Sequence, residues 1–389
     1  MGDRRGVLLL QACLGVALML PTATTASADF TFELHDTEGT GGAGAAHNLT
    51  AIDFDGAGAS DLIATNGNAH SVHCWTVDPD GGLAGVTCRF KGFAFDSPGA
   101  LAVADFNGDG TDDVALELRY YGPVDWWRGR QFVSTFLGSG SGQFVHADDL
   151  VLRASHPELA IFAADFNGNG KADLGVFTRD TARFGIVLGR GDGTLGNRLR
   201  YRSIAASRDG FALSDLNEDG DPDLVGLNRD ANRVVTRLGG PRRSFGAPWT
   251  FPAPEGAQSF FMSDLGSDTY EDLVLRYVDG GGSWNTVTLI GEGDGTFLPG
   301  GGFRGEYATA AAEFSPGSPD LLFSRADPFA IREGNGDHTF QPPVAAGLPD
   351  ENLSYVRDFN ADGRADVLTQ EFIHDCDCSK AHVYLQQAP

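Results

Sequence analysis

The sequence predicts an all-β fold, a seven-bladed β-propeller in which each blade is a sheet of four strands. Seven copies of an Asp-rich segment recur along the chain, with a period of about 50 residues that is typical of repeated supersecondary units. Short apolar runs bounded by Gly, Asp and Pro separate these copies, which is the pattern of strands and turns. No long stretch with a 3.6-residue apolar period competes with this interpretation. Four strands in about 50 residues match the size of a propeller blade.

Residues 1–28 are typical of an export signal. Arg4 and Arg5 supply a positive start, a mostly apolar run follows, and an Ala-Ser-Ala cleavage site ends at Ala28. We therefore expect a signal peptide that is cleaved after Ala28. The mature chain, residues 29–389, is expected to be secreted and to form a single propeller domain.

Two further sequence features bear on membrane attachment, and the net charge and composition bear on the possible partners. A lipobox-like sequence ending at Cys13 makes lipoprotein anchoring the less favoured alternative, because the apolar run continues beyond this cysteine to Leu20. No other segment is long and apolar enough to predict a membrane span. The formal net charge is −25, which argues against nucleic acid and anionic membranes because both attract basic surfaces. Hydrophobic residues make up 41% of the chain, so there is enough material for a core and disorder does not explain the acidity.

Four copies of the Asp-rich segment share a nine-residue pattern, with Asp at both ends and Asn at the third position. They are DFNGDGTDD at 105–113, DFNGNGKAD at 165–173, DLNEDGDPD at 215–223 and DFNADGRAD at 358–366. Three copies depart from the pattern, and they are DFDGAGASD at 53–61, DLGSDTYED at 264–272 and the shorter EFSPGSPD at 313–320. Each copy defines one repeat unit, numbered one to seven along the chain, and we call the segment its Asp loop.

Most units also contain a Gly-rich segment that ends in an apolar residue. Examples are GSGSGQF at 138–144, GRGDGTL at 189–195, GEGDGTF at 291–297 and GNGDHTF at 334–340. The seventh unit ends instead in a strand-like stretch at 382–385, and a further strand-like stretch at 30–34 precedes the first unit. We infer that the N-terminal strand completes the last blade and closes the propeller, which would remove free sheet edges that promote aggregation.

The Asp-rich pattern combined with the Gly-rich segment resembles the FG-GAP repeat, which is also called the VCBS repeat. The resemblance covers nearly the whole mature chain. It is strong in units two, three, four and seven, partial in units one and five, and largely lost in unit six. It implies the seven-bladed β-propeller of integrin α subunits and of many secreted bacterial proteins.

The Asp loops carry the oxygen ligands that calcium prefers. Calcium takes six to eight oxygens from a flexible loop, and side chains at positions 1, 3, 5 and 9 with a backbone carbonyl at position 7 would surround one ion. The ligands expected in unit two are Asp105, Asn107, Asp109, Asp113 and the carbonyl of Thr111. The corresponding residues are Asp165, Asn167, Asn169, Lys171 and Asp173 in unit three, Asp215, Asn217, Asp219, Asp221 and Asp223 in unit four, and Asp358, Asn360, Asp362, Arg364 and Asp366 in unit seven. We therefore expect about four calcium sites with a structural role.

Tight turns alone are the alternative explanation, because Asn-Gly and Asp-Gly favour turns. Turns account for positions 3 to 6, but not for an Asp at both ends of four loops at constant separation. Unit one has Ala57 at position 5 and unit five has Gly266 at position 3, so each loses a ligand and calcium binding there stays open. Unit six is one residue shorter, and we expect no metal in it.

The mature chain contains four cysteines, Cys74, Cys88, Cys376 and Cys378. In an oxidising compartment an even number favours disulfides, and we expect a bridge between Cys74 and Cys88 because they flank a turn-rich stretch. A zinc site that uses the C-x-C pair is less favoured, since it lacks the C-x₂-C spacing of structural zinc sites.

No catalytic pattern stands out in the sequence. The nine histidines are scattered, and neither a Ser-His-Asp nor a Cys-His arrangement can be recognised. We expect a monomeric, non-catalytic binding or adhesion module for a glycan or an extracellular protein. A secreted polysaccharide-degrading enzyme, a lyase or hydrolase, is the alternative, because propellers of similar repeats also occur in lyases.

An insertion in unit two with Trp126 and Trp127 is a candidate sugar-stacking surface, with packing between blades as the alternative.

Overall fold

A computed structural model describes most of the repeat region. The described residues are 32–39, 47–53, 61–66, 71–77, 82–86, 89–91, 98–119, 131–152, 159–178, 183–196, 200–203, 210–240, 244–324, 329–348, 352–373 and 378–386. Every regular element among them is a β-strand. None of them forms a helix of the length and apolar character that a membrane crossing requires.

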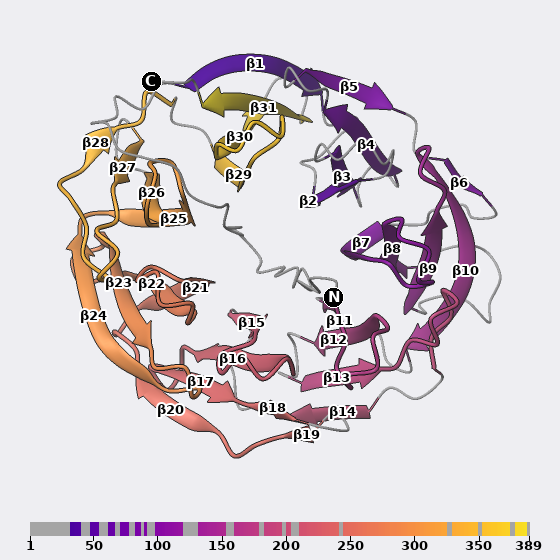
Figure 1. The fold of residues 1–389 in the computed structure, drawn as a ribbon, viewed down its shortest axis with the longest axis horizontal. Helices are drawn as coiled ribbons and strands as arrows, with labels where there is room; N and C mark the ends of the chain where they lie inside the picture. Colours follow the sequence, from indigo (N-terminus) through magenta and orange to yellow (C-terminus); the bar gives the residue numbers. More distant parts are fainter. Residues whose placement is uncertain are drawn as a thin grey trace.

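Seven sheets stand around a central axis (Figure 1), and we number them as blades one to seven after the repeat units. Blade one contains β2 (His47–Ile52), β3 (Asp61–Asn66), β4 (Ser71–Val77) and β5 (Leu83–Val86). Blade two contains β7 (Pro98–Ala104), β8 (Asp113–Arg119), β9 (Gln131–Gly138) and β10 (Gln143–Leu152). Blade three contains β11 (Leu159–Ala164), β12 (Asp173–Thr178), β13 (Arg183–Val187) and β14 (Arg200–Ser203).

The second half of the ring repeats this arrangement. Blade four contains β15 (Phe211–Ser214), β16 (Asp223–Asn228), β17 (Arg233–Arg237) and β20 (Trp249–Pro252). Blade five contains β21 (Ala257–Ser263), β22 (Asp272–Val278), β23 (Trp284–Gly291) and β24 (Phe297–Arg304). Blade six contains β25 (Tyr307–Ala312), β26 (Asp320–Ser324), β27 (Ala330–Arg332) and β28 (Val344–Ala345). Blade seven contains β29 (Asn352–Arg357), β30 (Asp366–Ile373) and β31 (Cys378–Gln386), and β1 (Phe32–Gly39) pairs antiparallel with β31.

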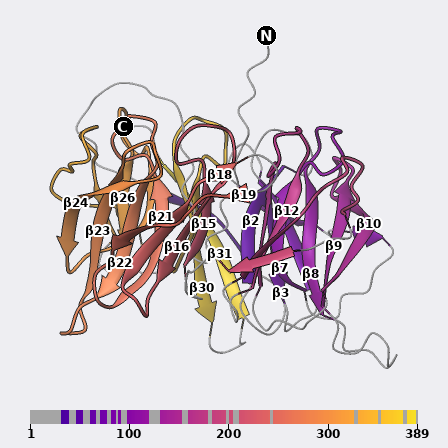
Figure 2. The ribbon, with the colours of Figure 1, turned by 90° about the horizontal axis from the view of Figure 1, so that it is seen from below.

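The predicted all-β, seven-bladed propeller of four-stranded blades is confirmed. Successive strands of each blade pair antiparallel, and the first strand of each blade lies nearest the central axis (Figure 1). Seen from the side, the strands run between two ends of the molecule where the connecting loops lie (Figure 2). Because the blades repeat one topology, equivalent loops of different blades lie at the same end.

Blade two departs from the expected four strands, because a fifth strand, β6 (Arg89–Lys91), pairs parallel with the outer strand β10. Phe90 of β6 explains this addition. Its ring stacks on Phe144, with the two ring centroids 4.8 Å apart, and meets Phe136 edge to face at 5.1 Å. The extra strand thus adds apolar packing and covers an edge that would otherwise be open to pairing.

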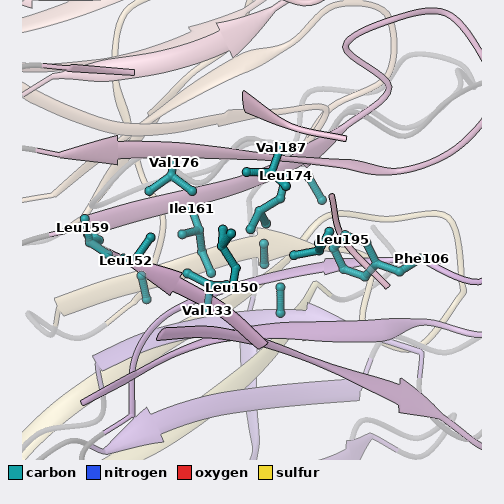
Figure 3. Close-up of a cluster of buried hydrophobic side chains, with 14 residues drawn as sticks. Phe106, Val133, Leu150, Leu152, Leu159, Ile161, Leu174, Val176, Val187 and Leu195 are labelled. Carbon is teal, nitrogen blue, oxygen red and sulfur yellow. The ribbon is translucent and has the colours of Figure 1, made fainter. Parts of the chain in front are cut away.

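The hydrophobic core is divided into layers between neighbouring blades. The layer between blades two and three contains Val133, Leu150, Ile161 and Leu174, all buried (Figure 3). All six residues of β12 are buried, because blades pack against both faces of this strand. The core therefore holds each blade to its two neighbours and fixes the positions of the loops at the ends.

Several predicted features lie outside the described residues. These are the signal segment at 1–28, the Trp126–Trp127 insertion, most of the Asp loop of unit one, and two of the mature cysteines, Cys88 and Cys376. Cys74 is buried on β4 opposite Val86 of β5. Pairing of Cys74 with Cys88 stays a prediction.

Candidate metal centre

Each described Asp loop joins the first strand of its blade to the second. The Asp at position 9 begins the second strand, and both of its carboxylate oxygens accept backbone hydrogen bonds. In unit three, Asp173 Oδ2 accepts from the Phe166 amide at 3.1 Å and Oδ1 accepts from the Gly189 amide at 2.8 Å. The first bond holds position 2 of the loop, and the second holds the start of the Gly-rich segment of the same blade.

Equivalent pairs of bonds recur in five further blades. Their acceptors and donors are Asp113 with Phe106 and Gly138, Asp223 with Leu216 and Gly239, Asp272 with Leu265 and Gly291, Asp320 with Ser315 and Gly334, and Asp366 with Phe359 and Gln386. In the shorter loop of unit six the last residue, Asp320, is counted as position 9, and the donor is Ser315 instead of the residue at position 2. The position-9 carboxylate therefore links the Asp loop to the end of the third strand of the same blade. Sequence reasoning had assigned this Asp only as a metal ligand.

The Asp at position 1 accepts hydrogen bonds from backbone amides in the middle of the loop. In unit two, Asp105 Oδ1 accepts hydrogen bonds from the amides of Gly108 at 2.6 Å and Asp109 at 3.2 Å, and Oδ2 accepts from Gly110 at 2.8 Å. Asp165, Asp215 and Asp358 hold the amides of loop positions 5 and 6 in the same way. Gly110 has a φ of 87°, a left-handed conformation in which glycine carries no steric penalty.

Positions 3 and 5 continue this pattern along the loop. In unit two, Asn107 Oδ1 accepts from the Asp109 amide, and Asp109 Oδ1 accepts from the Thr111 amide, both at 2.8 Å. The Asn107 amide group also donates to Asp109 Oδ2 at 2.8 Å. In unit three position 5 is Asn169, and Asn167 donates instead to the position-9 carboxylate of Asp173 at 2.7 Å. The loop thus gathers the polar side chains of positions 1, 3 and 5 within one turn.

The carboxylates of a loop repel one another. Burial and the nearby charges of Asp215 and Asp219 raise the pKa of Asp223 to about 7. Burial and the charges of Asp109 and Asp105 likewise raise the pKa of Asp113 to about 6. The loop therefore places a buried carboxyl group beside further negative charges.

These residues fit calcium in their chemistry. Among the described residues, no group of three or more His, Cys, Asp or Glu side chains is by itself arranged to hold a metal ion. The expected ligand set is different, since it also uses the Asn oxygen at position 3 and a backbone carbonyl at position 7. All of these donors are oxygens, as a hard cation requires. A divalent ion would favour the ionised form of the position-9 Asp, whose pKa is raised by burial and, to a smaller extent, by the neighbouring carboxylates.

The fifth and sixth Asp loops keep part of this arrangement without the full ligand set. In unit five, Asp264 accepts from the amides of Gly266 at 3.0 Å and Thr269 at 2.9 Å. Ser267 and Thr269 have φ values of 58° and 78°, so the backbone follows the left-handed course that glycines take in unit two. The turn itself therefore does not require the complete calcium pattern.

The Gly-rich segment of blade four was missed in the sequence. The structure shows that Gly239 pairs with Phe245 across a short turn, where β18 (Gly239–Gly240) meets β19 (Ser244–Phe245). Gly189 and Leu195 form the equivalent bridge in blade three. The spacing of six residues between the glycine and the apolar residue is the signal that would have found it.

Comparisons with known proteins agree with this fold. Residues 215–275 match the family model described as FG-GAP-like repeat. No protein with a curated description matches the chain in sequence.

Three solved structures illustrate the structural likeness. A lectin from Agrocybe aegerita, described as recognising non-reducing terminal N-acetylglucosamine, has a TM-score of 0.53 and 17% identity over 77% of this chain and 80% of the lectin. A putative 6-phosphogluconolactonase from Bacteroides uniformis has a TM-score of 0.52 and 13% identity over 84% and 94% of the two chains. Virginiamycin B lyase from Staphylococcus aureus has a TM-score of 0.50 and 14% identity over 91% and 100%.

At such low identity these likenesses show the fold alone. The chain is a seven-bladed β-propeller that contains an FG-GAP-like repeat at residues 215–275.

Proposed function

We propose that this protein is a secreted, calcium-binding β-propeller that acts as a monomeric, non-catalytic binding module for a glycan or an extracellular protein. The observation that carries the calcium part is the charge of the loops. Positions 1, 5 and 9 are all Asp in units two, four and seven, and their mutual repulsion contributes to the raised pKa of the position-9 residue. A divalent cation among these oxygens would turn that repulsion into attraction.

The ion would act through the hydrogen bonds already present in each blade. In unit four, Asp215, Asn217, Asp219 and Asp223 would hold it with the carbonyl of Asp221. Since Asp223 also binds the amides of Leu216 and Gly239, fixing this carboxylate would stiffen the connection between the loop and the Gly-rich segment. Extracellular calcium sites have dissociation constants of about 0.1–1 mM, so four sites at roughly 1 mM calcium would add about 2–6 kcal/mol of stability.

An exposed aromatic side chain supports the ligand-binding part. Trp249 on the outer strand β20 is 52% exposed. An exposed indole ring is a surface on which a sugar ring can stack. The lectin that resembles this chain in fold is described as recognising N-acetylglucosamine, and this favours a glycan as the first ligand class to test.

A polysaccharide and glycan panel tests the proposal. Residues 29–389 would be incubated with immobilised glycans in calcium and in chelator, and both retained protein and newly released sugar ends would be measured. We expect retention without release. Release of sugar ends would overturn the non-catalytic proposal in favour of a lyase or hydrolase, and neither signal would leave a protein as the ligand.

A matched pair of variants locates the binding surface. Trp249→Ala should weaken retention, whereas Leu298→Ala should not, although Leu298 on the outer strand β24 is similarly exposed at 51%. Equal effects of the two variants would contradict a role for the indole ring.

A further inference from the structure

The Gly-rich segment of a blade packs against the blade before it. In blade three, the amide of Gly193 donates to the Phe106 carbonyl in the second Asp loop at 3.1 Å, and Thr135 of blade two donates to the Gly193 carbonyl at 2.7 Å. In blade five, Gly295 accepts from Thr236 of blade four at 2.8 Å. Gly193 and Gly295 both stand at the fifth position of their segments, so this position lies at the junction between neighbouring blades.

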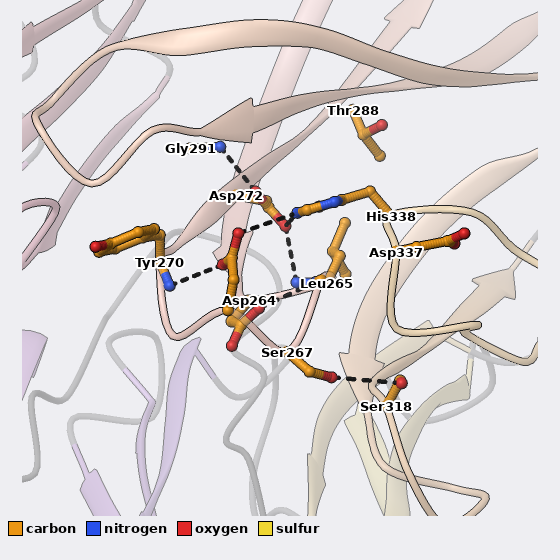
Figure 4. A network of polar contacts seen from close by, with 12 residues as sticks. Asp264, Leu265, Ser267, Tyr270, Asp272, Thr288, Gly291, Ser318, Asp337 and His338 are labelled. Carbon is orange, nitrogen blue, oxygen red and sulfur yellow. Dashed lines mark hydrogen bonds and ion pairs between the residues drawn. The ribbon is translucent and has the colours of Figure 1, made fainter.

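In blade six the fifth position is a histidine. His338 has a φ of 64°, close to the values of 82° and 84° at Gly193 and Gly295, so it keeps a backbone conformation that favours glycine. Its side chain reaches into the Asp loop of blade five, with Nε2 3.5 Å from Asp272 Oδ2 and 3.7 Å from Asp268 Oδ2 (Figure 4). Nε2 is buried and makes no hydrogen bond among the described residues.

The loop that receives this histidine has lost a side chain at the same place. Position 3 is Asn in units two, three, four and seven, but it is Gly266 in unit five. A Cβ atom at Gly266 would lie 2.1 Å from His338 Nε2, far inside van der Waals contact. The imidazole therefore occupies the space that a position-3 side chain would need, and the two changes from the repeat pattern complement each other.

Among the described residues, the charged groups that the structure records beside the imidazole are acidic. Asp268 and Asp272 face it from the fifth Asp loop, and Asp337 precedes it in its own segment. The positive contribution of His338 opposes the burial that raises the pKa of Asp272 to about 6. A protonated imidazole carries a positive charge, which is the contribution expected of an ion in the other loops.

We propose that His338 takes the place of calcium in the Asp loop of blade five, and that the same side chain joins blade six to blade five. Gly266 and His338 act together, because Gly266 leaves the space that the imidazole fills. Gly266 also lacks the side-chain oxygen that the calcium pattern requires at position 3. Only the comparison with calcium rests on the proposed function, whereas the contact across the junction does not.

A double-mutant cycle in chelator tests the contact without any metal. Gly266→Ala should lower the melting temperature by at least about 2 °C when His338 is present, because the new methyl group displaces the imidazole. The same Gly266→Ala change made in a His338→Gly chain should have little effect. An equal loss in both backgrounds would overturn the proposal, because Gly266 would then be needed for a reason unrelated to His338.

Calcium counting by equilibrium dialysis tests the exchange of histidine for metal. The Gly266→Asn/His338→Gly chain restores the repeat pattern and should bind one more calcium ion than the unsubstituted chain. His338→Gly alone serves as the control and should bind no additional ion, because position 3 still lacks a ligand. An unchanged count in the double variant would overturn the claim that His338 replaces the ion. An unsubstituted chain that binds no calcium would contradict the proposed function, and the cycle in chelator would still decide whether His338 holds the junction.

Discussion

The Asp loops of blades two, three, four and seven differ from those of blades five and six in the residues that could hold an ion. All six loops keep the position-9 Asp. Its two carboxylate oxygens accept hydrogen bonds from backbone amides of the loop and of the end of the third strand. Only the first group also keeps Asp or Asn at positions 1, 3 and 5. Position 9 therefore serves the fold by itself, whereas Asn at position 3 occurs only in the loops where calcium is proposed.

The largest expected effect comes from removing position 9 in either group. Asp223→Ala and Asp320→Ala each leave two backbone amides without an acceptor in a buried place. An unsatisfied buried donor costs about 1–3 kcal/mol, so each variant should lose about 2–6 kcal/mol of unfolding free energy. Urea unfolding in chelator measures both losses.

Asp320→Ala also separates the two roles of position 9. Because unit six lacks the calcium pattern, the unfolding free energy lost in Asp320→Ala should be the same in calcium and in chelator. The loss in Asp223→Ala should be larger in calcium. A small effect of Asp320→Ala under both conditions would contradict the structural role of position 9.

The pH dependence of stability should be next in size. Burial raises the pKa of Asp320 and of Asp223 to about 7. A carboxyl group with a higher pKa in the folded chain binds more protons there than in the unfolded chain, so stability is greatest at low pH and falls as the pH rises through about 7. In chelator we expect a fall on the order of 1–3 kcal/mol between about pH 5 and pH 7.5.

Calcium should reduce that fall without abolishing it. The ion binds the ionised form of Asp223 and so offsets its cost at higher pH, but it has no expected effect on Asp320. Urea unfolding at the two pH values, with calcium and with chelator, gives the four numbers required. A stability in chelator that increases over this range would contradict the burial of these carboxyl groups.

The smallest expected effect distinguishes position 5 in the two groups. Asp219→Ala removes a proposed ligand, and the stability that it loses should be larger by about 0.4–1.4 kcal/mol in roughly 1 mM calcium than in chelator. Asp268→Ala, the same change in blade five, should alter stability by an amount that does not depend on calcium. Thermal unfolding of both variants under both conditions measures this, and an equal calcium dependence would remove the distinction between the two groups of loops.

The sequence was sufficient for the blade count and for the main turn geometry. A period of about 50 residues with an Asp-rich segment in each unit left few architectures other than a propeller. The double role of position 9 could not be predicted, because an Asp at a loop end suits a metal and a pair of backbone amides equally well. The strand β6 was also beyond prediction, since a three-residue strand is specified by the partners of Phe90 rather than by any pattern of its own.

The pairing of Gly266 with His338 could not be predicted for a different reason. The two residues are distant in the sequence and belong to different blades. Each one taken alone is only a departure from the repeat. Their relation depends on which blade lies beside which and on the direction in which the fifth position of the Gly-rich segment faces, and both follow from the closed ring.

Thermal unfolding of residues 29–389 in roughly 1 mM calcium and in chelator decides whether calcium ions stabilise the propeller. Four structural calcium sites would contribute about 2–6 kcal/mol together, so the melting temperature should fall by several degrees when calcium is removed and should recover when it is restored. The same melting temperature under both conditions would contradict the account, because the four Asp loops would then hold their shape through hydrogen bonds alone.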